Sequence, residues 1–370
     1  MGVCIGLMSG TSLDAIDAAA CEFSDDAQWR RLIGTRSHRY PAAVREELLA
    51  LQRRPDTPIT LRDVARLDAV IGDSFAEAAA KLMGDLGLSA TDVTAIGSHG
   101  QTVFHDPTSL HTTTQLGDPN RIAARTGVRT VADLRRADMA HGGHGAPLMP
   151  AFHHALFADA YVQVVANIGG IANITVLPGS GGGDVFGFDT GPGNALLDDW
   201  AQHHLGVPYD RDGAWAASGS VDTALLQHCL ADPYFARPAP KSTGRDYFNL
   251  DWLHARGADL GSRAAADVQR TLLQLTVESL ARAIEARAPA AERLLVCGGG
   301  ARNRILMERL NARLPRLQVA DTGIRGLDPD WVEAAGFAWL AQRTVLGLSG
   351  NLPSVTGAAR PVILGGIYSA

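Results

Sequence analysis

Apolar positions along the chain follow two periods, and segments of the two kinds alternate from one end to the other. Short apolar runs at 3–7 and 15–23 predict two strands that flank a polar turn in GLMSGTSLDAID. Spacings of three and four residues then predict helix across 42–86, and VTAIGSHG predicts a short buried strand. Because strands alternate with helices, we expect an α/β fold.

The second half of the chain repeats this plan. Residues 161–177 have an apolar strand, a Gly-rich turn and a second apolar strand, as at the N-terminus. Further predicted elements are a hairpin loop at 180–184, an amphipathic helix over 272–286, a buried strand and turn in RLLVCGGGARN, a helix from Arg304, and a last helix capped by Asp330 and ended by Gly347 or Gly350. We therefore expect two domains with related folds.

The length of 370 residues also favours two domains, because one hydrophobic core rarely grows this large. The segment 131–150 is rich in Gly, His and Pro and is interpreted as a crossing between them. The predicted N-terminal domain comprises 1–133 with 346–370, and the second domain comprises 134–345.

Composition narrows the function. A net charge of -6 and a pI near 6.0 argue against nucleic acid and anionic membranes as partners. The 4 cysteines form no CxxC pair, which favours a reducing compartment. We find no apolar stretch of membrane-spanning length and no leader pattern, so a cytoplasmic protein is expected.

Three Gly-rich turns each follow an apolar strand: 9–14, 167–173 and 298–303. Bare backbone amides, together with the Thr11 and Ser12 hydroxyls, would suit the oxygens of a phosphate, although a turn of this kind taken alone is more often an ordinary hairpin or bulge. The chain contains no GxxxxGK[ST], no complete GxGxxG and no protein-kinase signature set. A P-loop is excluded, and a dinucleotide-binding fold is unsupported.

Eight motifs, taken in order along nearly the whole chain, resemble the anhydro-N-acetylmuramic acid kinase family. They are MSGTSLD, SHGQT, GGHGAPL, NIGGIAN, FDTGPGN, YDRDGAWAASG, KSTGRDYFN and CGGGARN. The resemblance implies two related α/β domains of the actin, Hsp70 and hexokinase type (ribonuclease H-like) around a central nucleotide cleft. It also implies a homodimer.

The resemblance further implies an activity. ATP, Mg²⁺ and water would open 1,6-anhydro-N-acetylmuramic acid and phosphorylate O6, giving N-acetylmuramic acid 6-phosphate and ADP in cell-wall recycling and amino sugar catabolism. The enzyme would be a phosphotransferase with an alcohol group as acceptor.

Nucleotide-binding residues are carried over from the matching motifs. They are Ser9, Gly10, Thr11, Ser12, Leu13, Asp14, Ala15, Ile16, Asp17, Asn167, Gly169, Gly170, Asn173, Gly298, Gly299, Gly300 and Asn303. Asp14 would hold Mg²⁺ through water, since this ion dehydrates reluctantly, or would simply cap its turn. Ala15 stands where the family often has Gly, and it would crowd the backbone if the position needs positive φ.

Asp189 in FDTGPGN follows an apolar run and precedes a Gly-rich turn, so we expect it at a strand end with its carboxylate directed into the cleft. The resemblance implies that it is the general base. The alternative is a carboxylate that only caps this turn. The predicted sugar ligands are His99, Gln101, Arg135 and Glu333. Arg135 or Arg136 would suit a carboxylate, whereas a solvated arginine and a dipole-stabilising Glu333 are the simpler explanations.

Other functions are consistent with parts of this pattern. A kinase of another small hydroxylated compound or a nucleotide-gated switch protein would share the fold. A glycosidase that uses Asp189 and Glu333 would leave three phosphate-like turns unexplained. His141 and His144 have no Cys or carboxylate partners spaced as in zinc sites, so we interpret them as hydrogen-bonding loop residues.

Overall fold

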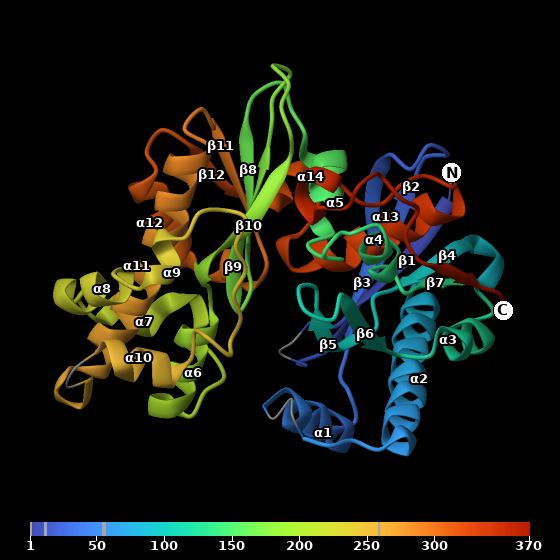
Figure 1. The fold of residues 1–370 in the computed structure, drawn as a ribbon, viewed down its shortest axis with the longest axis horizontal. Helices are drawn as coiled ribbons and strands as arrows, with labels where there is room; N and C mark the ends of the chain where they lie inside the picture. Colours follow the sequence, from blue (N-terminus) through green and yellow to red (C-terminus); the bar gives the residue numbers. More distant parts are fainter. Residues whose placement is uncertain (1, 11–12, 54–56, 258–259) are drawn as a thin grey trace. The chain divides into compact units, whose positions relative to one another are not determined.

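The computed structural model describes residues 2–10, 13–53, 57–257 and 260–370. The chain divides into two compact units (Figure 1): unit 1 is Met1–Leu156 with Trp331–Ala370, and unit 2 is Phe157–Asp330. The predicted boundaries after 133 and before 346 differ from this division, which gives 134–156 and 331–345 to unit 1. Segment 131–150 is therefore not the crossing between the units.

Unit 1 is built on one mixed sheet with the strand order β13-β7-β4-β1-β2-β3. β1 pairs antiparallel with β2, and β2 pairs antiparallel with β3, whereas β4 runs parallel to β1 and β7 runs parallel to β4. The strands are β1 Gly2–Met8, β2 Ile16–Phe23, β3 Trp29–His38, β4 Val93–Ser98, β7 Thr130–Ala132 and β13 Gly366–Tyr368, with a separate hairpin of β5 Gln101–Asp106 and β6 Thr112–Leu116.

Helices cover both faces of this sheet. Ile5 and Leu7 of β1 belong to a core shared with α2, and on the opposite face Cys4 donates to Gln342 of α13. A Cβ on Gly6 would collide with the Ala334 carbonyl of α13, so this helix is part of unit 1. The helices are α1 Ala42–Arg53, α2 Leu61–Leu86, α3 Pro119–Thr126, α4 Arg136–Ala140, α5 Met149–Phe157, α13 Val332–Val345 and α14 Pro353–Thr356.

Unit 2 repeats the sheet of unit 1, with the order β10-β9-β8-β11-β12. Here β8, β9 and β10 are antiparallel neighbours, and β11 and β12 continue in parallel from β8. The strands are β8 Gln163–Ile168, β9 Ile171–Leu177, β10 Phe186–Pro192, β11 Arg293–Cys297 and β12 Gln318–Asp321. Apart from β13, which adds a sixth strand at the edge of the unit 1 sheet, the strands of both sheets stand in the order third, second, first, fourth, fifth, which confirms two related α/β domains.

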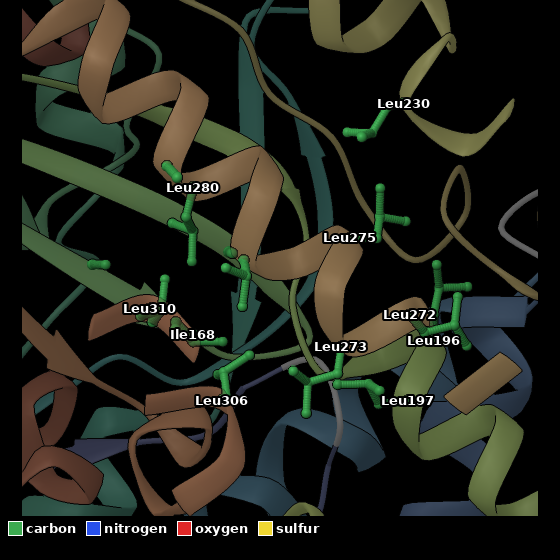
Figure 2. Close-up of a cluster of buried hydrophobic side chains, with 14 of the residues drawn as sticks. Ile168, Leu196, Leu197, Leu230, Leu272, Leu273, Leu275, Leu280, Leu306 and Leu310 are labelled. Atoms are coloured by element: carbon green, nitrogen blue, oxygen red, sulfur yellow. The ribbon is translucent and has the colours of Figure 1, made fainter. Parts of the chain in front are cut away.

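The core of unit 2 lies between its sheet and α11: leucines of α11, Ile168 of β8, and Leu196 and Leu197 of α6 belong to one buried cluster (Figure 2). The helices are α6 Ala195–Leu205, α7 Ala214–Ser218, α8 Thr223–Leu230, α9 Pro233–Ala236, α10 Leu250–Arg256, α11 Ala265–Arg287 and α12 Arg304–Arg313. One-turn 3₁₀ helices in the two units span Ala90–Asp92, Arg211–Gly213, Leu260–Ser262, Gly299–Arg302, Thr322–Arg325 and Pro329–Trp331.

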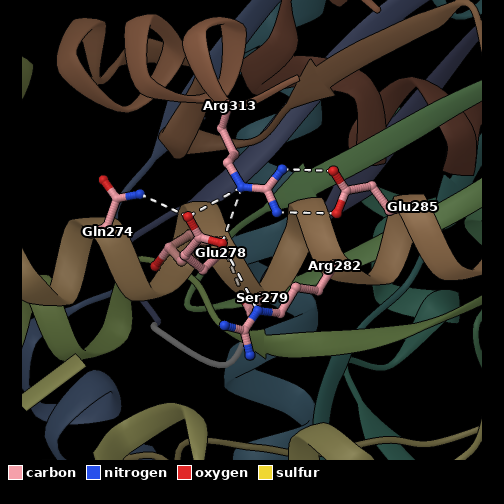
Figure 3. A network of polar contacts seen from close by, with 7 residues as sticks. Gln274, Glu278, Ser279, Arg282, Glu285 and Arg313 are labelled. Atoms are coloured by element: carbon pink, nitrogen blue, oxygen red, sulfur yellow. Dashed lines mark hydrogen bonds and ion pairs between the residues drawn. The ribbon is translucent and has the colours of Figure 1, made fainter. Parts of the chain in front are cut away.

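Figure 3 shows an ion-pair network that ties α11 to α12. Arg313 of α12 forms two parallel bonds to Glu285 of α11, at 2.6 and 3.0 Å, and its Nε donates to Glu278 at 3.1 Å. A bidentate arginine fixes geometry better than an isolated surface pair does. The network therefore sets how these two helices lie against each other.

One strand was missed in the sequence, and one predicted helix cap is wrong. β3 was not predicted, because its sequence WRRLIGTRSH interrupts the apolar pattern with arginines on a strand at the edge of the sheet. The last helix starts from Trp331, without a side-chain cap, and Asp330 instead accepts from Arg302 Nε at 2.9 Å.

Candidate functional site

In unit 1, polar residues gather where the parallel strands β1, β4 and β7 end. Ser9 follows β1, His99 follows β4, and Arg135 comes three residues after β7. The His99 amide donates to the Leu7 carbonyl at 3.0 Å, which joins the first two strand ends directly. Open α/β sheets bind their ligands at this edge.

The turn after β1 has a left-handed residue, but it is not the predicted one. Leu13 has φ 56° and is fully buried, and its amide donates to the Gly10 carbonyl at 3.3 Å. Ala15 has no positive φ, so its methyl group causes no strain there. Thr11 and Ser12, which were predicted to bind phosphate, lie outside the described residues.

The remaining predicted nucleotide residues of this segment differ in exposure. The Asp14 carboxylate is exposed, and Arg45 Nη2 lies 3.3 Å from it while Arg45 Nε donates to the Leu13 carbonyl. Ile16 is fully buried, so only its backbone can face a ligand. Asp17 accepts from Ser37 at 2.5 Å across β2 and β3.

The structure couples His99 to Arg135. Arg135 donates to His99 Nε2 from Nη2 at 2.8 Å and from Nε at 3.1 Å, and its Nη1 donates to the Gly145 carbonyl at 2.7 Å. Burial and the neighbouring guanidinium hold the pKa of His99 well below its ordinary value, so the ring is neutral. His99 is therefore a fixed acceptor that orients Arg135.

Two further predicted sugar ligands lie in unit 1. Burial raises the pKa of Glu333, Arg135 lowers it and Asp17 raises it, so these three charged groups lie within electrostatic reach of one another. Gln101 is 1 % exposed, and its amide group accepts from Tyr40 and donates to the Thr102 carbonyl. The Gln101 side chain is therefore engaged by hydrogen bonds within the fold. Arg135 and Glu333, by contrast, are only partly buried.

Asp138 was missed by sequence reasoning, although it organises the GGHGAPL loop. It is completely buried, and it accepts from Asn351 and Thr356 at 2.7 Å and from the Gly145 amide at 2.8 Å. Because the Gly145 carbonyl holds Arg135, this carboxylate supports the arginine indirectly. His141 uses both ring nitrogens, toward the Ala137 carbonyl and Arg360, as expected for a hydrogen-bonding loop residue.

In unit 2, the turns of NIGGIAN, FDTGPGN and CGGGARN lie together. The Gly193 and Asn194 amides donate to the Gly170 and Gly169 carbonyls, and Asn194 Nδ2 donates to the Ile168 carbonyl at 3.0 Å. A Cβ on Gly298 would approach the same Ile168 carbonyl to 2.9 Å. Asn194, absent from the predicted site, is therefore the residue that links two of these turns.

Some glycines in these turns are not explained by the fold. Gly10, Gly169 and Gly299 lack positive φ, and among the described atoms outside the adjoining chain a Cβ on any of them would meet nothing closer than 3.7 Å. Glycines with such open space also occur on ordinary surface, but these three lie at strand ends. The bare backbone there leaves room for a ligand group to approach closely.

A polar row crosses three strands of unit 2. Asn173 of β9 pairs in register with Asn167 of β8 on one side and with Asp189 of β10 on the other. Residues directly opposite in antiparallel strands share a face, and here it is the face away from Ile168 and the core. The predicted base thus lies beside one predicted nucleotide residue, Asn173, and one strand further from a second, Asn167.

Asp189 has few partners for a partly buried carboxylate. Its Oδ2 accepts from the Thr243 amide at 3.0 Å, and no ion pair to it exists within the described ranges. Burial raises the pKa of Asp189 from 3.8 to about 6, and the Thr243 hydrogen bond only partly opposes this. Such a carboxylate remains ionised at neutral pH and is a stronger base than an ordinary aspartate.

Asn303 has a structural role that the sequence did not reveal. Its Oδ1 accepts from the Leu306 amide at 3.0 Å and caps α12, and a Cβ on Gly213 would collide with the same oxygen. The side chain is therefore already engaged by the fold.

None of the helices in the described part of the chain has the length and apolar character needed to cross a membrane.

Comparisons with known proteins agree on one family. The sequence profile described as "AnmK: Anhydro-N-acetylmuramic acid kinase" matches residues 2–370. A relative from Xanthomonas axonopodis pv. citri (strain 306), named anhydro-N-acetylmuramic acid kinase, is 52 % identical over 370 residues, which cover 99 % of this chain and 98 % of that protein. A relative of the same name from Shewanella halifaxensis (strain HAW-EB4) is 49 % identical over 368 residues, 99 % of this chain and 98 % of the relative.

Solved structures resemble the fold more distantly. An activator of 2-hydroxyisocaproyl-CoA dehydratase from Clostridium difficile has a TM-score of 0.47 at 11 % identity and covers 92 % of this chain and 94 % of its own. A ROK family glucokinase from Streptomyces griseus has a TM-score of 0.41 at 14 % identity, and the match covers 92 % of this chain and 100 % of the glucokinase. The family assignment therefore rests on sequence.

The family and the names of the relatives identify this chain as a phosphotransferase that acts on a hydroxyl group. The chain belongs to the anhydro-N-acetylmuramic acid kinase family.

Proposed function

We propose that this protein phosphorylates 1,6-anhydro-N-acetylmuramic acid with ATP, opening the anhydro bridge with water in the same reaction. Family membership across residues 2–370 supports the substrate class. The single structural observation that carries the chemistry is Asp189, a partly buried carboxylate with one backbone hydrogen bond and a pKa of about 6.

In the proposed reaction, Asp189 takes a proton from a water molecule whose oxygen attacks the anomeric carbon. The bond between that carbon and O6 breaks, and O6 keeps the electron pair. O6 then attacks the γ-phosphorus of ATP, and the bond to the β-phosphate oxygen breaks to release ADP. The proton held by Asp189 is later lost to solvent. General-base assistance of this kind contributes about 10²- to 10⁴-fold.

The proposed nucleotide ligands are the turns of each unit. Backbone at Gly10 in unit 1, and at Gly169 and Gly299 in unit 2, has open space that suits phosphate or nucleotide atoms. Asp14 fits a Mg²⁺ role because its carboxylate is exposed, so the ion would bind it through a water molecule. Mg²⁺ would neutralise charge on the phosphates.

The proposed sugar ligands are Arg135 and Glu333, the partly buried members of the unit 1 group. The Arg135 guanidinium would bind the lactyl carboxylate, and Glu333 would accept from a sugar hydroxyl or amide. His99 and Gln101, which are buried and bonded internally, would hold the strand ends and Arg135 in position. The same proposal includes a cytoplasmic homodimer that acts in cell-wall recycling and amino sugar catabolism.

The test measures ADP release from Mg·ATP with and without 1,6-anhydro-N-acetylmuramic acid in ¹⁸O-labelled water, followed by mass analysis of the sugar. We expect sugar-dependent ADP release and one label at the anomeric position of a 6-phosphate product. A hydrolysed sugar without ADP would indicate a glycosidase, and ADP release that does not require the sugar would indicate a nucleotide-driven switch. Either result contradicts the proposal.

A further inference from the structure

Unit 2 contains a cavity of about 330 Å³ that involves none of the residues assigned above. Its lining comes from α11, from one face of α12 and from the end of α7. Two arginines reach it, Arg270 from α11 and Arg309 from α12, and Ile305 and Ala217 provide apolar wall. The cavity thus combines positive charge with an apolar surface.

Arg270 has no partner in the fold. It is 5 % exposed, and within the described ranges it has no ion pair and no side-chain hydrogen bond. Among the residues that the structure describes, no other Arg or Lys is as little exposed. No guanidinium nitrogen of Arg270 is fully shielded from solvent, so this unpaired charge opens onto the cavity, where an anion from outside the chain would pair with it.

The neighbours of Arg270 increase the positive charge. Arg309 is close enough that, after burial, it is a second cause of the lowered pKa of Arg270. The carboxylate at the rim, Glu308, is engaged by Arg304 at 2.5 Å one helical turn away. Two guanidinium groups therefore face the cavity, while its acidic neighbour is already paired.

We propose that this cavity binds a small phosphate ester, with the phosphate between Arg270 and Arg309 and its organic part against Ile305 and Ala217. A phosphate dianion matches two guanidinium groups in charge and in planar, bidentate geometry. The volume lies at the lower end of small-ligand pockets and exceeds what a bare phosphate ion would fill.

The test measures binding of two probes, glucose 6-phosphate and inorganic phosphate, by isothermal titration calorimetry without ATP or anhydro sugar. We expect both to bind and the ester to bind more tightly, because only the ester uses the apolar wall. Arg270→Gln and Arg309→Gln should each weaken binding of the ester roughly ten- to hundred-fold, the usual range for a lost charge-assisted hydrogen bond. Arg316→Gln, an exposed control in the same unit, should bind as the parent does.

Arg270→Gln removes an unpaired charge and should not lower the thermal unfolding midpoint, while Arg309→Gln changes an exposed residue and tests the site if the first variant fails to fold. Failure of both probes to bind, or equal binding by the parent and Arg309→Gln, would overturn the inference. Competition by a non-hydrolysable ATP analogue would also overturn it, because the arginines would then belong to the nucleotide site. Since no turnover is measured, these results are independent of the proposed kinase reaction.

Discussion

Two aspartates of unit 2, Asp232 and Asp189, have sharply different surroundings. Asp232 is fully buried and accepts four hydrogen bonds, from the Tyr234 amide, Tyr247, Trp252 and Arg256, at 2.6 to 2.8 Å. Burial alone would raise the pKa of Asp232, but these donors together lower it. A carboxylate with this many hydrogen-bond donors stabilises the fold and is a weaker base than an ordinary aspartate.

Asp189 is the opposite case, with one backbone donor and a pKa raised to about 6 by burial. The two sites are connected through one residue: the Tyr234 amide donates to Asp232, and the Tyr234 hydroxyl donates to the Asp189 carbonyl at 2.6 Å. The number of donors, rather than burial, separates the structural carboxylate from the candidate base. Asp232, whose carboxylate has all its hydrogen-bond donors, thus holds Tyr234, and Tyr234 in turn holds the backbone of Asp189.

The largest expected effect is on turnover. Asp189→Asn keeps the shape of the side chain and an acceptor for the Thr243 amide but removes the base, so kcat should fall by about 10²- to 10⁴-fold. Nucleotide affinity, measured by calorimetry, should change little. Asp184→Asn, an exposed control in the loop before β10, should keep parental turnover, and near-normal turnover in Asp189→Asn would disprove the base assignment.

Next in size is the stability carried by Asp232. Asp232→Asn leaves Arg256 without its counter-charge and places the amide hydrogens of the new side chain against groups that are themselves donors. The free energy of unfolding in urea should therefore fall by about 3 kcal/mol. Asp251→Asn on the exposed side of α10 is the matched control and should leave the free energy of unfolding unchanged. Equal stability of the Asp232 variant and the parent would mean that this carboxylate does not anchor the segment.

Removing the charge of Asp189 should stabilise the protein, whereas removing that of Asp232 should destabilise it. Because its pKa is raised in the folded state, the folded protein binds the proton more tightly, and stability falls as pH rises from about 4 to 6. Asp189→Asn should therefore be more stable than the parent at pH 7, by up to roughly 3 kcal/mol, since each pKa unit corresponds to about 1.4 kcal/mol. Thermal unfolding at pH 4 should bring the two together, whereas a difference that does not depend on pH would contradict the raised pKa.

The smallest effect concerns the connection between the two aspartates. Tyr234→Phe removes the hydrogen bond to the Asp189 carbonyl, and we expect a loss of about 1 kcal/mol in stability with a roughly two- to tenfold lower kcat. The acid side of the pH profile should keep its midpoint, because the carboxylate keeps its burial. Tyr209→Phe, an exposed tyrosine in the same unit, serves as control. A shifted midpoint would show that Tyr234 acts on the carboxylate itself.

Local patterns were sufficient to predict much of the fold. β1, β2, β8 and β9 were predicted because apolar runs flank Gly-rich turns, and their repetition indicated two related units. The boundaries could not be predicted, because α13 joins unit 1 through close packing on Gly6 and Gly97, far away in sequence. A Cβ on either glycine would meet the backbone of that helix, and neither glycine belongs to a recognisable motif.

The candidate site shows the same limit. Asp189 and the three turns could be selected from motifs, but the row of Asn167, Asn173 and Asp189 depends on strand register and on a bulge after Asp189. The pairing of His99 with Arg135 spans 36 positions, and that of Asp189 with Thr243 spans 54. Such contacts arise from tertiary packing, which no local pattern encodes.

The most direct test of the account is the pH dependence of kcat/KM for 1,6-anhydro-N-acetylmuramic acid at saturating Mg·ATP, in the parent and in Asp189→Asn. For the parent we predict a rate that falls tenfold per pH unit below a midpoint of about 6, because the protonated carboxyl cannot accept a proton from water. The residual rate of Asp189→Asn should lack this limb. A parental rate that stays constant down to pH 5, or the same limb in both proteins, would contradict the assignment of Asp189 as the base.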